Sequence, residues 1–340
     1  MIDLSRGTHI VTGGAGLIGS AIIWALNRRG IDDILVVDRL DTTEKWQNLV
    51  PLRYRDYLDA DDFERALGGG AKPFGDLTAI FHLGACSTTT ENDAAFLMRN
   101  NYQYTKNVAQ FAAAHGVRLV YASSAATYGA LESNLSDESD LRTLRPLNMY
   151  AYSKHLFDLY AQRCGLLDRI AGVKYFNVFG PNEAHKGAMR SLVDKAFHQI
   201  SAAGTVQLFR SYRPEYRDGE QQRDFLYVKD AADMTLHLAE REAYGLYNVG
   251  SGEAHTWLDL VRPIFGAMGV PERIEFVDMP EQLRAKYQYS TCAQIDRLRQ
   301  TGYERDITPL DLAVTDYVRN YLVPNQRLDP AQATSGALVN

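Results

Sequence analysis

Two tyrosines and a lysine stand close together in the stretch M-Y-A-Y-S-K, which runs from Met149 to Lys154. Tyr150 lies four residues before Lys154, so in a helix the two side chains share one face, one turn apart. An ammonium group beside a phenol favours the phenolate and lowers the pKa of the phenol from its ordinary value of about 10. Such a tyrosine can accept a proton from a hydroxyl group while a cofactor removes hydride from the same carbon. Tyr152 falls on another helical face, and its spacing to Lys154 fits no such role.

A glycine-rich turn near the start of the chain can bind the cofactor that this chemistry needs. The segment T-G-G-A-G-L-I-G-S, residues 12–20, follows an apolar strand pattern and opens a helical one. Its Gly13, Gly16 and Gly19 allow a tight turn in which backbone N–H groups approach a pyrophosphate at the helix N-terminus. Asp38 closes the next predicted strand, about 20 residues further on, where a carboxylate accepts hydrogen bonds from a ribose hydroxyl. This combination predicts a nicotinamide dinucleotide site.

The residues that follow Asp38 bear on which dinucleotide is bound. The carboxylate of Asp38 favours NAD, whereas Arg39 directly after it can neutralise the 2′-phosphate of NADP. Lys45 adds a second cation nearby in the sequence. We therefore expect NADP as the cofactor, with NAD as the alternative.

Short apolar runs alternate with longer helical patterns through the first half of the chain. The runs are residues 9–13, 33–38, 79–84, 118–124 and 173–179. Near-continuous hydrophobicity in short runs predicts strands that are covered on both faces of a parallel sheet. Their alternation with helical patterns predicts repeated βαβ units, and therefore an α/β fold with a doubly wound parallel sheet.

The sequence also suggests how the chain is divided into domains. We expect residues 1–176 to form a Rossmann domain, with a returning segment near 223–245. Residues 177–222 and 246–323 are expected to form a smaller α/β domain that binds substrate. Residues 324–340 lack periodicity, which predicts a disordered tail.

Composition restricts the classes of function. A chain of 340 residues with a formal net charge of −6 lacks the basic excess of a general nucleic-acid binder. Cys86, Cys164 and Cys292 are widely spaced without a C-x-x-C pair, which favours free thiols over a disulfide framework or a metal site. No apolar run approaches the ~18 residues of a membrane span, and no signal-peptide pattern opens the chain. We expect a cytoplasmic protein without a bound metal.

The strand predicted to end near Ser124 supplies a third reactive group. In Y-A-S-S-A-A-T-Y-G, residues 121–129, either Ser123 or Ser124 can orient the reacting hydroxyl. Together with the glycine-rich turn and the Tyr150/Lys154 spacing, this stretch resembles the extended short-chain dehydrogenase/reductase superfamily over most of the chain. The resemblance selects Ser124, the serine four positions before the tyrosine of S-x-x-x-Y-G, as the partner of Tyr150 and Lys154.

An ordered set of further stretches narrows the resemblance. They are G-A-C-S-T-T-T from Gly84, N-N-Y-Q-Y-T-K from Asn100, F-N-V-F-G-P from Phe176, H-K-G-A-M from His185, Q-R-D-F-L-Y-V-K-D from Gln222 and K-Y-Q from Lys286. In this order they resemble the ADP-glyceromanno-heptose 6-epimerase family. The resemblance implies inversion of C6 in ADP-D-glycero-β-D-manno-heptose for lipopolysaccharide inner-core precursor synthesis, and it implies a homo-oligomer.

The resemblance also implies a role for each matched position. Lys186, in H-K-G, matches the second acid/base of the family, opposite the tyrosine. The implied substrate contacts are Ser124, Asn177, His198, Phe209, Arg223 and Tyr287. The implied cofactor contacts, besides those named above, are Leu17, Ile18, Leu83, Gly84, Ala85, Cys86, Ser87, Asn100, Tyr150, Lys154, Val178 and Lys186. A guanidinium at Arg223 can bind diphosphate oxygens through paired hydrogen bonds.

The sequence departs from this family pattern at several points. Ala188 stands where relatives carry a serine that contacts substrate, and Ala60 replaces a basic residue near the cofactor phosphate. Residues 189–198 and 211–222 form longer segments than their counterparts.

The implied reaction has no net redox change. NADP⁺ takes hydride from C6 while one base removes the hydroxyl proton, and hydride then returns to the opposite face of the ketone. Inversion therefore needs acid/base groups on both faces, Tyr150 and Lys186. The alternatives are a UDP-hexose 4-epimerase, which gives Lys186 no role, and a 4,6-dehydratase, which needs an acidic residue that A-A-T-Y after Ser124 lacks. A non-catalytic NADP-binding scaffold or redox sensor is the alternative from another class, and it needs no proton-transfer group.

Overall fold

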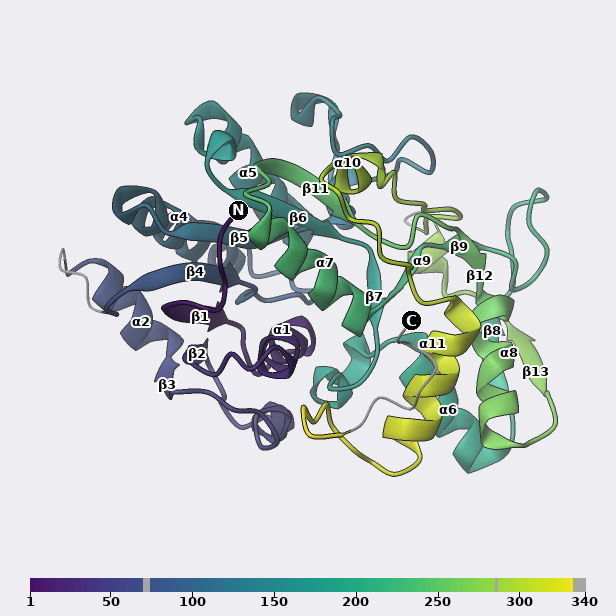
Figure 1. Ribbon diagram of the computed structural model, residues 1–340. Coiled ribbons are helices and arrows are strands. Elements are labelled where there is room, and N and C mark those ends of the chain that lie inside the picture. The colour runs from purple at the N-terminus through teal and green to yellow at the C-terminus, as the bar shows by residue number, and fades with distance from the viewer. Residues whose placement is uncertain (70–73, 285–286, 333–340) are drawn as a thin grey trace.

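A seven-stranded parallel sheet lies at the centre of the computed structural model, which describes residues 1–69, 74–284 and 287–332 (Figure 1). Its strands, in chain order, are β1 (Thr8–Thr12), β2 (Ile34–Asp38), β3 (Asp56–Asp59), β4 (Leu77–His82), β5 (Arg118–Ser124), β6 (Ala171–Tyr175) and β11 (Gly245–Val249). In space they run β11-β6-β5-β4-β1-β2-β3, and each neighbouring pair is parallel. The predicted doubly wound α/β fold is confirmed.

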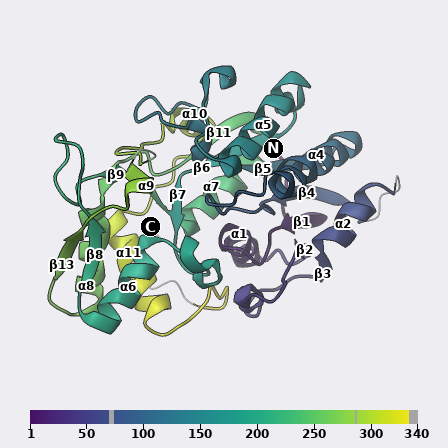
Figure 2. The same cartoon turned by 180° about the vertical axis from the view of Figure 1, so that it is seen from behind.

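Helices cover both faces of this sheet (Figures 1 and 2). One face packs against α1 (Leu17–Arg28) and α7 (Val228–Glu240), and the other against α2 (Ala60–Leu67), α4 (Tyr104–His115) and α5 (Met149–Arg163). Successive strand residues alternate between the two cores: Val11 and Val36 join the core of α1, whereas Ile10 and Leu35 join the core of α5. Because both cores are apolar, the strands read as continuous apolar runs in the sequence.

Smaller elements from the second half of the chain pack beside the sheet (Figure 1). Three strand pairs form there, namely β7 (Asn177–Phe179) with β10 (Phe225–Tyr227), β8 (Val206–Phe209) with β13 (Ile274–Val277), and β9 (Gln222–Arg223) with β12 (His255–Thr256). The helices of this part are α6 (Leu192–Ala203), α8 (Trp257–Met268), α9 (Glu281–Arg284), α10 (Asp296–Gln300) and α11 (Leu310–Tyr317), and a short α3 (Ala94–Leu97) precedes α4. Within the three described ranges, no helix is long and apolar enough to cross a lipid bilayer.

The strand predicted over residues 173–179 is divided in the structure. β6 ends at Tyr175, and the next residues enter β7, which pairs with β10 outside the large sheet. The Phe176 N–H donates to the carbonyl of Val249 at 3.0 Å, at the end of β11, where the chain turns away from the sheet. β11 also extends the large sheet to residue 249, beyond the returning segment that the sequence placed near 223–245.

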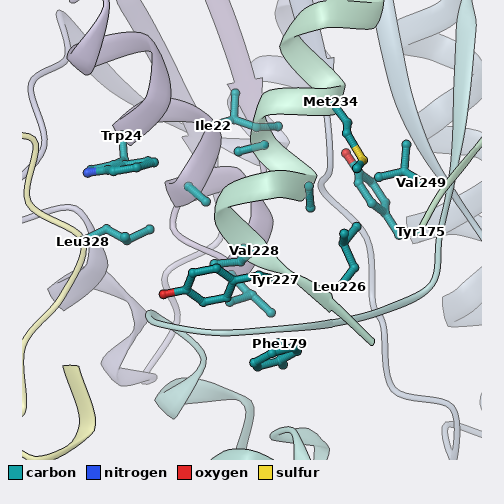
Figure 3. Packing of buried hydrophobic residues seen from close by; sticks show 14 of the residues in the cluster. Ile22, Trp24, Tyr175, Phe179, Leu226, Tyr227, Val228, Met234, Val249 and Leu328 are labelled. Carbon is teal, nitrogen blue, oxygen red and sulfur yellow. The ribbon is translucent and has the colours of Figure 1, made fainter. Parts of the chain in front are cut away.

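Residues 324–332 differ from the disordered tail that the sequence predicted. Leu328 is buried beside Trp24 of α1 (Figure 3), and the Trp24 Nε1–H donates to the Asp329 carbonyl at 3.3 Å. The Leu328 N–H donates to Asn182 Oδ1 at 3.0 Å. One apolar side chain and a few hydrogen bonds hold this segment, and such isolated contacts leave no periodic pattern in a sequence. Residues 333–340 lie outside the described residues.

We expect Leu328→Ala to lower the free energy of unfolding by about 2–5 kcal/mol, because the truncation leaves a cavity in the core. Chemical denaturation followed by circular dichroism measures this change. Leu312→Ala on α11 is a suitable control, since Leu312 is 47% exposed and its truncation should change stability by less than about 0.5 kcal/mol. A Leu328 variant as stable as the unmodified chain would show that the segment does not pack in solution.

Candidate active site

A cavity of about 1160 Å³ opens at the carboxyl ends of the central strands. The chain order reverses between β1 and β4, and ligands bind at such a switch point in open α/β sheets. The glycine-rich turn, the end of β5 and the start of α5 line one part of the cavity. Residues of the 177–199 segment, β8 and α8 line the other part. The cavity therefore joins the predicted cofactor and substrate positions.

Most of the residues predicted to form the site line this cavity. They are Gly13, Gly16, Leu17, Ile18, Gly19, Asp38, Lys45, Leu83, Gly84, Ala85, Ser87, Ser124, Tyr150, Lys154, Asn177, Val178, Lys186, Phe209, Arg223 and Tyr287. Among the described residues, four predicted ones do not line it, namely Arg39, Cys86, Asn100 and His198. Lys286, the first residue of K-Y-Q, lies outside the described residues.

Ser124, Tyr150 and Lys154 come together where β5 ends and α5 begins. Asn148 caps α5, because its Oδ1 accepts a backbone N–H of the first turn at 2.8 Å. This cap places Tyr150 in the first turn of the helix, within hydrogen-bond reach of Ser124. Lys154 follows one turn later, and its Nζ donates to the carbonyl of Ala122 in β5 at 2.8 Å.

Burial determines the direction of both pKa shifts in this pair. It raises the pKa of Tyr150 above its ordinary value, and the hydrogen bond with Ser124 opposes the shift only in part. Burial also lowers the pKa of Lys154 to about 8, although the carboxylate of Asp158 acts in the other direction. The spacing of Tyr150 and Lys154 had predicted a lowered pKa for the phenol. The direction differs because desolvation of the phenol dominates and the ammonium group is bonded to the Ala122 carbonyl.

A fully buried ion pair fixes the helix that carries these groups. Asp158, one turn after Lys154 in α5, lies 3.1 Å from the Nζ of Lys174 in β6. The same carboxylate accepts hydrogen bonds from the hydroxyls of Tyr121 at 2.8 Å and Ser123 at 2.7 Å, both in β5. Asp158 therefore connects α5 with two neighbouring strands directly behind the cavity.

This network also distinguishes the two serines at the end of β5. The hydroxyl of Ser123 donates to Asp158, whereas Ser124 interacts with Tyr150 at the cavity. Sequence reasoning missed Asp158 and Lys174. The available signal was the position of Asp158, four residues after Lys154 on the same helical face.

The glycine-rich turn lets a ligand approach the backbone closely. Gly13 has φ = +66°, which favours glycine. A Cβ on Gly19 would lie 2.1 Å from the carbonyl oxygen of Gly13, so a side chain there would displace the turn. Gly16, the N-cap of α1, lines the cavity. These features fit a pyrophosphate bound at the N-terminus of α1.

Asp38 connects this turn with the end of β2. Its Oδ2 accepts the N–H of Ala15 at 2.8 Å, and its Oδ1 accepts a hydrogen bond from Lys45 Nζ at 2.9 Å. Lys45 belongs to the short helical turn η1 (Glu44–Asn48) and lines the cavity. The negative charge of Asp38 is therefore balanced by a cation in the cavity wall.

Three predicted cofactor residues, Arg39, Cys86 and Asn100, do not line the cavity and bond to other residues. Arg39 forms an ion pair with Asp61 at 2.5 Å and donates a hydrogen bond to Asn100 at 2.5 Å. The backbone N–H of Cys86 donates to Asn101 Oδ1 at 2.9 Å, and the Asn101 amide donates back to the Cys86 carbonyl at 3.0 Å. These contacts connect Arg39 with Asp61 and Asn100, and Cys86 with Asn101.

Lys186 lines the cavity from the helical turn η6 (Ala184–Met189), but His198 does not. The His198 side chain is 56% exposed, and its Nδ1 lies 3.3 Å from Asp194 Oδ1, which holds the ring at the surface of α6. Lys195 lines the cavity from the same helix. Its Nζ has no hydrogen-bond partner within the described parts of the chain. The sequence comparison selected His198 by its match to the family pattern and did not consider which face of α6 points into the cavity. Lys195 was therefore missed.

Arg223 lies close to two aromatic rings that also line the cavity, those of Tyr287 and Trp257. Its guanidinium carbon is 5.2 Å from the ring centre of Tyr287 and 5.8 Å from that of Trp257. The Trp257 Nε1–H donates to the Tyr287 hydroxyl at 2.7 Å. Arg223 Nη1 donates to the Gln222 carbonyl at 2.7 Å and Nη2 donates to the Gln288 carbonyl. The guanidinium therefore connects β9 with the segment that follows α9. Trp257 had no signal in the sequence.

Asn177 and Phe209 also line the cavity. The side-chain amide of Asn177 donates to the Asp224 carbonyl at 2.9 Å, and Phe209 ends β8 with a partly exposed ring. The described ranges contain no group of three or more histidine, cysteine or carboxylate side chains that could hold a metal ion.

The fold and the cavity together define a class of protein. A dinucleotide-type turn, a Ser–Tyr–Lys set and a second lysine surround one space, which suits reversible oxidation of a hydroxyl group. The chain belongs to the NAD dependent epimerase/dehydratase family, whose sequence model matches residues 9–250. The predicted family is confirmed, and the cofactor is a nicotinamide dinucleotide.

Individual relatives are similar over nearly the whole chain. An ADP-L-glycero-D-manno-heptose-6-epimerase of Nitratidesulfovibrio vulgaris (strain DP4) is 52% identical over 316 residues, which cover 92% of this chain and 98% of the relative. The crystal structure of a Helicobacter pylori ADP-L-glycero-D-manno-heptose-6-epimerase has a TM-score of 0.77 and 25% identity, covering 93% of this chain and 96% of that chain. A Thermus thermophilus UDP-glucose 4-epimerase in complex with NAD has a TM-score of 0.70 and 25% identity, covering 92% and 98%.

Proposed function

We propose that this chain is an isomerase that interconverts ADP-D-glycero-β-D-manno-heptose and ADP-L-glycero-β-D-manno-heptose, for lipopolysaccharide inner-core precursor synthesis. One observation carries the chemistry: acid/base candidates from two separate elements, Tyr150 on α5 and Lys186 on η6, line a single cavity. Inversion of a hydroxyl-bearing carbon through a ketone needs such a group on each face. The relative with 52% identity, named as an ADP-L-glycero-D-manno-heptose-6-epimerase, supports the choice of substrate.

In the first half-reaction the C6 hydroxyl loses its proton to the residue on its own face. A nicotinamide dinucleotide, when bound, supplies the acceptor of the C6 hydride and later its donor. On one face Tyr150 accepts the proton while Ser124 orients the hydroxyl oxygen. Lys154, with a pKa of about 8, carries a positive charge near neutral pH and stabilises the phenolate form of Tyr150, which is present before Tyr150 accepts the proton and again after it gives one back.

In the second half-reaction the C6 ketone turns its other face to the hydride donor. Lys186 then gives a proton to the ketone oxygen, and the epimeric alcohol forms. When the other epimer is the substrate, the order is reversed: Lys186 accepts the first proton and Tyr150 gives the last. The cavity walls retain the ketone between the two steps.

The nucleotide half of the substrate is assigned to the end of the cavity formed by β8, α6 and α8. Lys195 takes the place of His198 among the proposed substrate contacts, because it faces the cavity and His198 does not. Each terminal nitrogen of Arg223 donates one N–H to a backbone carbonyl. The remaining N–H groups of the guanidinium are the ones proposed to bind a diphosphate. Phe209 and Tyr287 supply apolar surface.

NADP is the proposed form of the cofactor. Lys45 lies beside Asp38 in the cavity wall and offsets its charge, so a 2′-phosphate there would meet a cation. Arg39 adds a second positive charge next to Asp38, although it is shared with Asp61.

Purified protein should interconvert the two C6 epimers of ADP-heptose without added reductant. Chromatographic separation of the epimers after incubation with each one measures the reaction. The two reactions should converge on the same mixture, because a retained cofactor returns every hydride that it takes. Turnover of a UDP-hexose in place of ADP-heptose would instead support a 4-epimerase.

Tyr150→Phe and Lys186→Met should each lower the epimerisation rate by at least about 100-fold, since each removes a proton-transfer group. Both variants should retain the bound dinucleotide, which absorbance of the purified protein and mass spectrometry can check. His198→Ala is a matched control on the same segment as Lys186, and it should retain most of the activity. Near-normal turnover of the Lys186 variant would rule out the two-base scheme.

Denatured protein should release NADP, identified by mass spectrometry. Lys45→Ala should weaken NADP binding more than NAD binding, because it removes a charge that faces the 2′-phosphate. Titration of the stripped protein with each dinucleotide compares the two affinities. Release of NAD alone, with equal effects of Lys45→Ala on both affinities, would contradict the assignment.

A further inference from the structure

Glu183 is a buried carboxylate at the base of the loop that carries Lys186. The loop leaves β7 after Phe179, forms η6 and enters α6 at Leu192. Glu183 is only 1% exposed and does not line the cavity. The proposed reaction uses Lys186, but it gives Glu183 no part. A buried ionisable group needs a structural or functional reason, because its desolvation is costly.

The carboxylate of Glu183 closes the loop by binding both of its ends. At the far end, Oε2 accepts the N–H of Ser191 at 2.6 Å and Oε1 accepts the Ser191 hydroxyl at 2.6 Å. At the near end, Oε1 also accepts the N–H of Gly180 at 3.4 Å. Between them, the Lys186 N–H donates to the Glu183 carbonyl oxygen at 2.9 Å. The Lys186 backbone is therefore held in a turn that one side chain ties together.

The same loop is fixed to the nucleotide-binding part of the chain by Asn182. Its side-chain amide donates to Ser20 Oγ of α1 at 2.9 Å, and its Oδ1 accepts the Leu328 N–H at 3.0 Å. Asn182 thus sets where the loop sits relative to α1. It makes no hydrogen bond to the Ser191 end in the described structure. Arg190 donates to the Gly187 carbonyl within the turn through its Nε at 3.0 Å, but Glu183 is the side chain that binds Gly180 and Ser191 at its two ends.

Charge supports the same reading. Burial raises the pKa of Glu183, and the charge of Lys186 is the largest of the effects that oppose this shift. Lys186 and Lys195 repel each other. The charge of Lys186 contributes to the lowered pKa of Lys195, although burial and Arg190 contribute more. A negative charge at Glu183 reduces the repulsion among these cations and favours one placement of the Lys186 ammonium group.

We infer that Glu183 is a positioning residue for the second acid/base: its carboxylate holds the Lys186 turn closed and keeps the Lys186 ammonium group aimed into the cavity. This inference rests on the proposed two-base epimerisation. It has a directional consequence, because Tyr150 is held by α5 and β5, which make no hydrogen bond to the Glu183 loop within the described residues. Loss of Glu183 therefore affects proton transfer on one face of the substrate and spares the other.

The test is Glu183→Gln, followed through cofactor reduction in a single turnover with each epimer separately. Lys186→Met first establishes which epimer needs Lys186 for its oxidation, since only the other epimer should reduce the cofactor in that variant. Glu183→Gln should slow reduction by the Lys186-dependent epimer by roughly 10- to 100-fold, as expected for a misplaced proton-transfer group. Reduction by the Tyr150-dependent epimer should stay within about twofold of the unmodified enzyme, whose measured rate is the reference for this comparison.

Asp194→Asn is the matched control. Asp194 is also 1% exposed at the start of α6, but its carboxylate pairs with Arg190 at 2.8 Å and with His198. This variant should change reduction by both epimers equally. If it shows the same asymmetry as Glu183→Gln, the start of α6 is responsible and the inference is overturned. Equal slowing of both epimers by Glu183→Gln, or no slowing, also overturns it.

Ser191→Ala keeps the test decisive if Glu183→Gln does not fold. It removes one hydrogen bond to Glu183 and retains the charge, so a smaller asymmetry of the same direction is expected, and its absence counts against the inference. Failure of the proposed function is recognised separately. If the unmodified enzyme does not interconvert the epimers, or Lys186→Met oxidises both normally, the two-base scheme fails and this inference falls with it.

Discussion

The covering of both faces of the parallel sheet is the constraint on which the rest of this structure depends. Helices α1 and α7 bury one face and α2, α4 and α5 bury the other, so the sheet can present ligand-binding groups only at the ends of its strands. The glycine-rich turn follows β1, and Ser124 ends β5. The reversal of chain order between β1 and β4 then opens a space at that edge, and the cavity lies there.

A buried charge network makes this edge specific. Asp158 and Lys174 form an ion pair inside the fold, and such a pair persists only when hydrogen bonds satisfy the remaining oxygens. The hydroxyls of Tyr121 and Ser123 meet this condition for Asp158. The network therefore fixes the rotation of α5 against β5. That rotation places Tyr150 beside Ser124 and sends the Lys154 side chain toward the strand.

The opposite wall of the cavity lies outside the seven-stranded sheet, and individual side chains hold its Lys186 loop in place. The loop that carries Lys186 is tied to α1 through Asn182, to the C-terminal segment through Leu328, and to the start of α6 through Glu183. Each tie is a buried polar contact between residues far apart in the chain or on either side of a turn. In the proposed reaction the two acid/base groups must face each other across the substrate. These contacts position Lys186, as the sheet and α5 position Tyr150, so both are needed for that arrangement.

The sequence by itself determined the local patterns: the apolar runs of the parallel strands, the glycine-rich turn with Asp38 at the end of the next strand, and the spacing of Tyr150 and Lys154. Each depends on residues within one element or one βαβ unit, where geometry follows directly from spacing. Only the tertiary structure decided the rest. It placed Lys195 in the cavity and His198 outside it, assigned Ser123 to Asp158, raised the pKa of Tyr150 through burial, and packed Leu328 against Trp24. Those outcomes depend on which residues distant in the chain come into contact and on how far they are shielded from water. The spacing of residues within one element determines neither.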